Sequence, residues 1–212
     1  MIDKISNSNF SFIGFIQILK LVFENNVFVC NRKFYKQIKG IAMGSKCGPS
    51  IANIYLYIIE KSFLNIHKPL FYCRYIDDIF CVLKKSFNTE ILISHFGYLK
   101  LNEISSNSVN FLDLIITYDN LTNSIKFSLY IKPTNTFSYL ITNSKHPSFI
   151  TKNLPFGIFI RIRRICTSII DFYYFTEKIS HQLKTRGYNI KRNLKIINTI
   201  ANLDRSSLLL LY

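Results

Sequence analysis

An apolar segment near the middle of the chain, residues 70–83, is interrupted by two adjacent carboxylates, Asp77 and Asp78. Aromatic and β-branched residues, which favour strands, are abundant on both sides of this pair. Burying an ionised carboxylate without a cation costs free energy, so we expect the pair at a solvent-exposed bend. The segment therefore predicts a β-hairpin with Asp77-Asp78 at its tight turn.

Two carboxylates at the tip of a hairpin are consistent with two uses. The dipeptide alone favours a plain turn, because Asp is common in turns. A strand-held pair also presents hard oxygen ligands to Mg²⁺, which takes one or two carboxylates and completes its shell with water and phosphates. Two such ions ~3.5–4 Å apart can activate a 3′-hydroxyl and stabilise a departing pyrophosphate.

A glycine-rich segment, residues 37–50, precedes the hairpin, and an amphipathic segment separates the two. Apolar residues at 51, 54, 55, 58, 59 and 63 predict a helix, and Pro49 suits its first turn. A glycine-rich loop lets the backbone approach a flat ligand and offers N–H groups to phosphates, although a plain helix-entry turn is the alternative. The order of loop, helix and Ile-Asp-Asp hairpin favours the functional interpretation.

Several other segments have clear patterns. We expect a buried helix at 10–24, a hairpin of 27–30 and 33–35 across Asn31-Arg32, and strands at 109–118 and 125–131 around Asp119-Asn120. From residue 144 the pattern becomes helical and basic, which places a domain boundary near 143 and divides the chain into domains 1–143 and 144–212.

The chain is strongly basic. Its 212 residues include 27 Lys and Arg against 12 Asp and Glu, a net charge of +15. Such a charge indicates a polyanionic partner, with nucleic acid as the first candidate and an anionic membrane surface as the second. A codon bias toward Asn, Ile and Lys would also raise the net charge. Residues 144–205 alone carry 12 basic and 3 acidic residues, a net of +9.

The apolar stretch at 10–23 contains Gln17 and Lys20 and is shorter than the ~20 residues of a spanning helix, so we expect no membrane partner.

The five cysteines are dispersed, and the four histidines are scattered. No Cys-x-x-Cys pair or zinc-ligand spacing is present. We therefore expect reduced core thiols in an intracellular protein.

Taken together, the motifs resemble those of the reverse transcriptases of Penelope-like retroelements, which are relatives of the telomerase catalytic subunit. The glycine-rich segment and the following helix are similar to the second palm motif, and residues 74–80 (RYIDDIF) are similar to the third, the catalytic hairpin. The matching downstream residues, with x for an unmatched position, are FLD at 111–113, KPTxT at 132–136, YL at 139–140, SxHP at 144–147, RRxC at 163–166 and RGY at 186–188.

The resemblance implies an RNA-directed DNA polymerase in an intracellular, reducing compartment such as the nucleus. Its partners would be an RNA template, a DNA primer duplex and deoxynucleoside triphosphates, and its cofactor would be Mg²⁺, two ions in the intact enzyme. Asp77 would coordinate both ions with help from Asp78, and Tyr75 would lie near the primer end. The pocket for the template base and the incoming nucleotide would be shaped by Gln37, Gly40, Met43 and Gly44. The duplex phosphates would contact Lys132, Arg161, Arg163 and Arg164.

One family feature is not matched. Family members carry a further metal-binding Asp on an earlier palm strand, and the surroundings of Asp3 do not fit that motif. Because a two-metal site with fewer carboxylates neutralises the metal charge poorly, we expect the isolated chain to be a weak or inactive polymerase and a fragment of a longer protein.

The expected fold class is α+β, with an antiparallel palm sheet covered by helices on one face and then a mainly helical, basic, thumb-like region. Two other interpretations stay open. The chain can be a non-catalytic nucleic-acid-binding protein, since residues 161–166 and 185–188 resemble parts of a helix-turn-helix, or a degenerate product without a stable fold.

Overall fold

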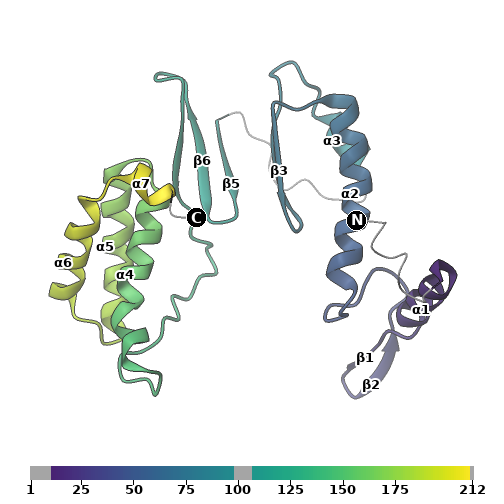
Figure 1. Ribbon diagram of the computed structural model, residues 1–212, viewed down its shortest axis with the longest axis horizontal. Coiled ribbons are helices and arrows are strands. Elements are labelled where there is room, and N and C mark those ends of the chain that lie inside the picture. The colour runs from purple at the N-terminus through teal and green to yellow at the C-terminus, as the bar shows by residue number, and fades with distance from the viewer. Residues whose placement is uncertain (1–10, 98–106, 211–212) are drawn as a thin grey trace. The chain divides into compact units, whose positions relative to one another are not determined.

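The computed structural model describes residues 11–97 and 107–210 (Figure 1). Within these ranges the chain divides into two units. The first contains residues 11–70 and 83–97, and the second contains residues 71–82 and 107–210. Both units combine helices with small antiparallel sheets, so the α+β class is confirmed at this level. The expected boundary near residue 143 stays a prediction.

The first unit contains three helices and one hairpin among its described residues. These elements are α1 (Phe12–Glu24), β1 (Val27–Cys30), β2 (Lys33–Lys36), α2 (Gly48–His67) and α3 (Glu90–Phe96). In the β1–β2 hairpin the two loop residues, Asn31 and Arg32, have φ of 50° and 62°. Positive φ at both loop positions is the requirement of a type I′ turn, so the predicted hairpin is confirmed.

Helix α2 begins where the glycine-rich segment ends, with Pro49 in its first turn as expected. Its inner face packs against α3 through Phe63, which is fully buried and contacts Phe96 in a tilted arrangement with ring centroids 5.3 Å apart. The His95 Nε2 atom lies 3.2 Å from the carbonyl oxygen of Ile59 in α2. These contacts form the small core of the first unit.

Helix α1 forms as predicted, and the Ser11 side chain caps it by accepting a hydrogen bond from the Gly14 N–H at 3.0 Å. The expectation that this helix is buried was wrong. None of its residues is buried, and Phe12 is 77% exposed. The apolar sequence favours the helix, but no described element packs closely over it. No helix in the described ranges is both long and apolar enough to span a bilayer.

The cysteines differ from one another in burial. All five are free thiols, but only Cys166 is buried, and Cys30 on β1 is exposed. The prediction of core thiols therefore holds for Cys166 and was wrong for Cys30, because all residues of both strands of the β1–β2 hairpin are exposed. Burial raises the pKa of the Cys166 thiol to about 11, which keeps it protonated and unreactive at neutral pH.

The second unit contains two antiparallel sheets and four helices in its described part. Its elements are β3 (Phe71–Tyr75), β4 (Asp78–Val82), β5 (Ser108–Phe111), β6 (Leu114–Asp119), β7 (Ser124–Leu129), α4 (Ser148–Ile165), α5 (Ile169–Thr185), α6 (Ile190–Ala201) and α7 (Arg205–Leu209). Strands β3 and β4 pair with each other, and β5, β6 and β7 form a meander in that order.

The single strand expected at 109–118 was wrong, because this range contains a second hairpin. Strand β5 ends at Phe111, which pairs with Leu114, so Leu112 and Asp113 form a two-residue loop. The expected turn after Asp119 is present and leads into β7. There the Lys126 ammonium holds the pKa of the Asp119 carboxyl well below its usual range.

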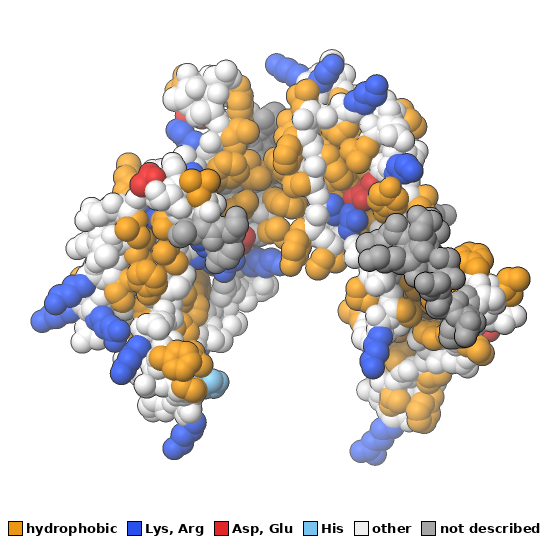
Figure 2. All heavy atoms as spheres, viewed as in Figure 1, with side chains coloured by type: hydrophobic (Ala, Val, Ile, Leu, Met, Phe, Trp, Pro, Cys, Tyr) orange, Lys and Arg blue, Asp and Glu red, His pale blue; other side chains and the backbone are white. Residues whose placement is uncertain are grey.

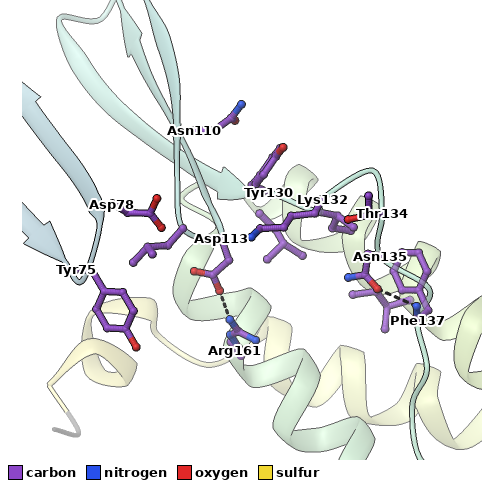
Figure 3. A pocket seen from close by; sticks show the side chains of 14 residues that line it. Tyr75, Asp78, Asn110, Asp113, Tyr130, Lys132, Thr134, Asn135, Phe137 and Arg161 are labelled. Carbon is purple, nitrogen blue, oxygen red and sulfur yellow. Dashed lines mark hydrogen bonds and ion pairs between the residues drawn. The ribbon is translucent and has the colours of Figure 1, made fainter. Parts of the chain in front are cut away.

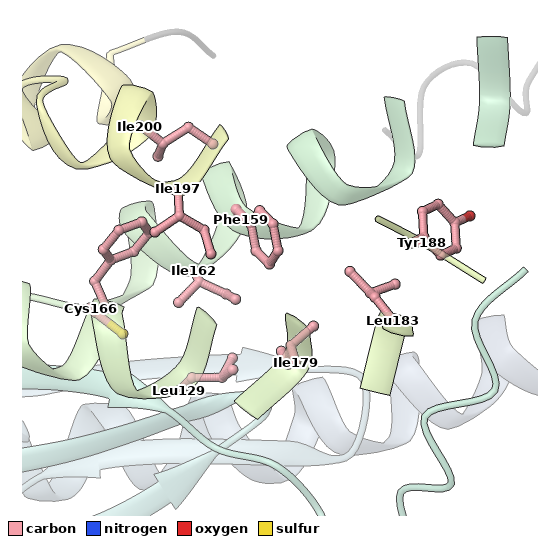
Figure 4. Close-up of a cluster of buried hydrophobic side chains, with 10 residues drawn as sticks. Leu129, Phe159, Ile162, Cys166, Ile179, Leu183, Tyr188, Ile197 and Ile200 are labelled. Carbon is pink, nitrogen blue, oxygen red and sulfur yellow. The ribbon is translucent and has the colours of Figure 1, made fainter. Parts of the chain in front are cut away.

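The basic C-terminal region is helical, as predicted, and it contains the main hydrophobic core (Figure 4). Helices α4 and α5 both pack against β7, where Leu129 contributes to the core. Backbone bonds strengthen this contact, since the Thr167 N–H donates to the Phe127 carbonyl oxygen at 2.8 Å. Phe159 of α4 is completely buried in this cluster. Burying a side chain of this size contributes about 1.5–3 kcal/mol.

Replacement of Phe159 by alanine should destabilise the second unit by about 3–5 kcal/mol, because it leaves a large cavity between the helices and β7. The free energy of unfolding, measured with urea, tests this. Phe149→Ala is a matched control, since Phe149 lies in the first turn of the same helix but is 63% exposed, and its loss should cost less than about 1 kcal/mol. Equal losses in the two variants would contradict the assigned core.

Candidate functional site

The Asp pair lies at the tip of the β3–β4 hairpin, within the second unit. Tyr75 pairs with Asp78, so the two-residue loop consists of Ile76 and Asp77. The turn therefore falls one residue earlier than predicted, with Asp78 as the first residue of β4. Both aspartates are exposed, as expected from the cost of burying their charge.

The hairpin tip has a strained backbone. Ile76 has a φ of 55°, in the left-handed region that β-branched residues rarely adopt. The turn is braced by Arg74, whose guanidinium donates to the Ile76 carbonyl oxygen at 2.6 Å. Strain of this kind costs about 1–3 kcal/mol and is common at functional sites.

The β5–β6 hairpin repeats this design. Leu112 is the first loop residue and has a φ of 56°, and Asp113 follows it as Asp77 follows Ile76. The β4 and β5 strands are in contact, and the rings of Phe80 and Phe111 lie 5.7 Å apart. The second unit thus carries two hairpin loops that each begin with a bulky residue at positive φ and end with an aspartate.

The β5–β6 loop and the two residues that flank the β3–β4 loop, Tyr75 and Asp78, contribute to one cavity of about 700 Å³ in the second unit (Figure 3). Its other walls come from the end of β7, the segment that follows it, and helices α4 and α5. The lining residues are Tyr75, Asp78, Asn110, Leu112, Asp113, Leu129, Tyr130, Ile131, Lys132, Thr134, Asn135, Phe137, Arg161 and Ile179. We call this cavity the central pocket. Carboxylates, cations and amides all line it, so it is suited to a polar, charged ligand.

An ion pair crosses the central pocket. The guanidinium of Arg161 on α4 binds the carboxylate of Asp113 on the β5–β6 loop, and Figure 3 shows the two side chains pointing toward each other. Their exposed fractions are 67% and 34%, so solvent screens the pair, and its contribution to stability is about 0.2–1 kcal/mol. Burial raises the pKa of the nearby Tyr139 hydroxyl, and the positive charge of Arg161 partly opposes that shift.

Four of the residues predicted from the sequence meet at the central pocket. They are Tyr75, Asp78, Lys132 and Arg161. Asp77 is exposed in the adjacent loop but is not part of the lining.

The other two predicted arginines have contacts elsewhere in the second unit. The Nε atom of Arg164 donates to the Leu208 carbonyl oxygen of α7 at 2.9 Å. Arg163 is half-buried, and its Nε atom has no hydrogen-bond partner among the described residues. Arg164 therefore makes a contact within the second unit, and Arg163 is partly buried there. Contact of either side chain with a nucleic acid backbone stays a prediction.

The glycine-rich segment belongs to the first unit. It has no regular structure up to Cys47, and α2 begins at Gly48. Gly40 and Gly44 have φ of 80° and 94°, conformations that favour glycine, while Met43 is fully exposed between them. The Gln37 side chain donates to the Lys39 carbonyl oxygen at 2.9 Å. A shared site with the hairpin stays a prediction.

Sequence reasoning did not assign five polar residues of the central pocket to the site: Asn110, Asp113, Tyr130, Thr134 and Asn135. Asp113 was treated as a structural strand residue. The sequence does contain a signal for a turn at Asp113. Leu112-Asp113 stands between two strand-like segments and has the same order, an aliphatic residue followed by Asp, as Ile76-Asp77. Thr134 belongs to a quoted motif, but that motif does not place it at a pocket. Asn110, Tyr130 and Asn135 have no sequence signal, because the fold alone brings them to the pocket.

Asp77 and Asp78 fit part of a magnesium site. Their exposed, adjacent carboxylates are the kind of ligand that Mg²⁺ accepts, and this ion needs only one or two of them from a protein. Among the residues with described positions, no group of three His, Cys, Asp or Glu side chains is arranged to hold a metal ion.

Comparison with known proteins gives one match. A family model described as an animal helix-turn-helix domain matches residues 138–198, which is less than a third of the chain. This range covers the segment before α4, then α4, α5 and most of α6. No curated protein and no solved structure matches the chain.

Replacement of Ile76 by glycine should raise the free energy of unfolding by up to about 1 kcal/mol. Glycine relieves the left-handed strain, and its greater freedom in the unfolded chain offsets only part of that gain. Thermal or urea unfolding measures the change. Ile79→Gly is the control, since Ile79 is a half-buried residue of β4 without positive φ, and its loss should destabilise the protein. Similar destabilisation by both variants would exclude strain at the tip.

Proposed function

We propose that this chain is the palm-to-thumb part of an RNA-directed DNA polymerase similar to the reverse transcriptases of Penelope-like retroelements. In this proposal β3–β4 and β5–β6–β7 belong to the palm sheet, and α4–α7 form the thumb-like region. The order of the sequence motifs supports the proposal, as does an exposed carboxylate pair at the tip of a hairpin.

The central pocket is the observation that carries the proposal. Tyr75 and Asp78 at one side belong to the hairpin of the third palm-like motif, while Lys132 and Arg161 come from the segment and helix that follow the sheet. A polymerase needs this combination, since carboxylates must hold metal ions next to cations that bind phosphates. The exposed guanidinium of Arg161 would exchange Asp113 for a backbone phosphate when the template–primer duplex enters.

Asp77 and Asp78 are the residues that would hold Mg²⁺ in this proposal. The bound ions would supply activation of the primer 3′-hydroxyl and stabilisation of the leaving pyrophosphate. The chain's own contribution would be to position the primer end beside Tyr75 and to fix the duplex through its phosphates. Gln37, Gly40, Met43 and Gly44 would shape the pocket for the template base and the deoxynucleoside triphosphate. With only one carboxylate pair, the isolated chain would be a weak or inactive polymerase.

Metal binding can be tested without catalysis. Mn²⁺, a paramagnetic substitute for Mg²⁺, should broaden the amide NMR signals of residues 75–79 in the wild-type chain. The Asp77→Ala variant should lose this broadening, since it removes one of two oxygen donors that are close together. Asp119→Ala is a matched control, because Asp119 is an aspartate paired with Lys126 at another turn. Broadening that persists in Asp77→Ala would contradict the assigned metal ligands.

Primer extension tests the polymerase itself. With Mg²⁺, an RNA template and a DNA primer, the isolated chain should extend the primer slowly or not at all, and any extension should disappear in Asp77→Ala. Binding of the duplex should persist in that variant and decrease about tenfold at low salt in the Lys132→Ala, Arg161→Ala double variant, which loses two phosphate contacts. Rapid extension by the chain alone would show that the carboxylate pair is sufficient, and extension unaffected by Asp77→Ala would exclude the proposed site.

A second candidate function is non-catalytic nucleic-acid binding by the C-terminal helices. It is favoured by the helix-turn-helix match at 138–198 and by the local net charge of +9 between residues 144 and 205. Salt-dependent binding without Mn²⁺ binding at residues 75–79 would support this function over the first one.

A further inference from the structure

Helix α6 has two distinct faces. The inner face consists of Asn193, Ile197 and Ile200, which are buried against the bundle at a spacing of four and three residues. The amide of Asn193 donates to the Ser180 hydroxyl of α5 at 3.2 Å. This face holds the helix in a fixed rotation about its axis.

The outer face consists of Lys191, Leu194, Lys195 and Asn198, all of them exposed. Their spacing, i, i+3, i+4 and i+7, places them in one row along the helix. We call these four residues the outer row. Figure 2 shows basic side chains projecting from the part of the bundle where Figure 1 labels α6. The row combines two cations with one apolar and one amide side chain.

The turn that leads into α6 is held firmly by the segment before α4. Gly187 has a φ of 89°, and a Cβ atom at this position would overlap the Thr142 hydroxyl. The Thr142 N–H donates to the Arg186 carbonyl oxygen at 3.1 Å, and the Tyr188 hydroxyl donates to the Leu140 carbonyl oxygen at 2.9 Å. The region matched by the helix-turn-helix family begins at residue 138, so it includes this brace. Helix α6 is therefore presented by a rigid support.

The surroundings of α6 in the sequence contain no acidic residue. Between Glu177 and Asp204 there are six basic residues and no Asp or Glu. The guanidinium of Arg192 turns back toward α4, where it donates to the Lys152 carbonyl oxygen at 3.4 Å. A cationic helix face is complementary to a polyanion.

We propose that α6 is a DNA-reading helix whose outer row enters the major groove of double-stranded B-form DNA. Lys191 and Lys195 bind phosphates at the edge of the groove. Leu194 contacts a thymine methyl group, and the Asn198 amide binds the N6 and N7 edge of an adenine. The row thus predicts a preference for A·T pairs at the centre of the site.

Duplex DNA fits this surface better than RNA does. Helix α6 has 12 residues, so it is about 18 Å long, and the major groove of B-DNA is about 12 Å wide, which admits one helix. The major groove of an A-form duplex is too narrow for side chains to reach its base edges. In helix-turn-helix proteins the second helix of the motif occupies the groove, and α6 is second after α5 and the turn at Gly187.

This inference does not depend on the polymerase proposal. The outer row shares no residue with the central pocket. Loss of duplex binding through Lys132 and Arg161 would leave α6 unaffected, and failure of α6 to bind DNA would leave the metal site unaffected.

Fluorescence anisotropy with a labelled 20-base-pair DNA of mixed sequence tests the phosphate contacts, using the full chain. Lys191→Ala and Lys195→Ala should each weaken binding about fivefold to tenfold near 0.1 M salt and should reduce the slope of log K against log salt by about 0.9. Lys178→Ala is the matched control, because it removes the same charge from an exposed position on α5 and should change binding less than twofold. Equal effects of all three variants would indicate attraction by net charge alone and would overturn the proposal.

Selection from a random DNA library tests base reading. The wild-type chain should enrich an A·T-containing site, and Asn198→Ala should lower the preference for this site over a scrambled one by about tenfold with little change in salt slope. Leu194→Ala should relax the preference at a neighbouring thymine. The chain should bind an RNA duplex of the same sequence without preference. No enriched site, or equal affinity and preference for RNA, would exclude a DNA-reading helix, and unchanged melting temperatures would show that the variants fold.

Discussion

The packing of α4 and α5 on β7 is the interaction on which the described site depends. Leu129 of β7 and Ile179 of α5 belong both to the buried core and to the wall of the central pocket. The same side chains that exclude water from the core therefore fix the distance between the sheet and the helices. Without that contact Arg161 would have no defined position relative to Asp113, and the pocket would lose the wall that carries its guanidinium.

Opposite charges from separate elements meet at the central pocket. Asp78 and Asp113 lie on two hairpins, and Lys132 and Arg161 lie on the segment and helix that follow the sheet. Because the Asp113–Arg161 pair is exposed, solvent screens it, and a phosphate can replace the carboxylate at small cost. A fully buried pair would be expensive to break and unsuited to a transient ligand.

Local sequence patterns predicted the helices and strands of this fold well, but they predicted poorly which of these elements are buried. The Asn31-Arg32 hairpin and the start of α2 near Pro49 follow from residues within a few positions of the turn or cap, so the sequence was sufficient for them. The turn at Leu112 was missed because positions with positive φ in turns are usually occupied by glycine, asparagine or aspartate. Here a bulky leucine has the positive φ. The exposure of α1 could not be predicted, since an apolar pattern shows what a helix can bury and not whether a partner is present.

The candidate site was predictable where one short motif carries its chemistry. Asp78 and Tyr75 are part of such a motif, whereas Asn110, Tyr130 and Asn135 reach the pocket only through the meander and the segment after β7.

The two basic surfaces of the second unit, the central pocket and the outer row of α6, differ in the residues that accompany their cations. Cations in a pocket that is also lined by carboxylates can hold a nucleic acid backbone in register with a reacting group. Such binding does not depend on the base sequence. A cationic helix face that also carries an amide and an apolar side chain can discriminate between base pairs. In both proposals charge would attract nucleic acid to the surface, and the uncharged residues beside the charges would determine what each surface does there.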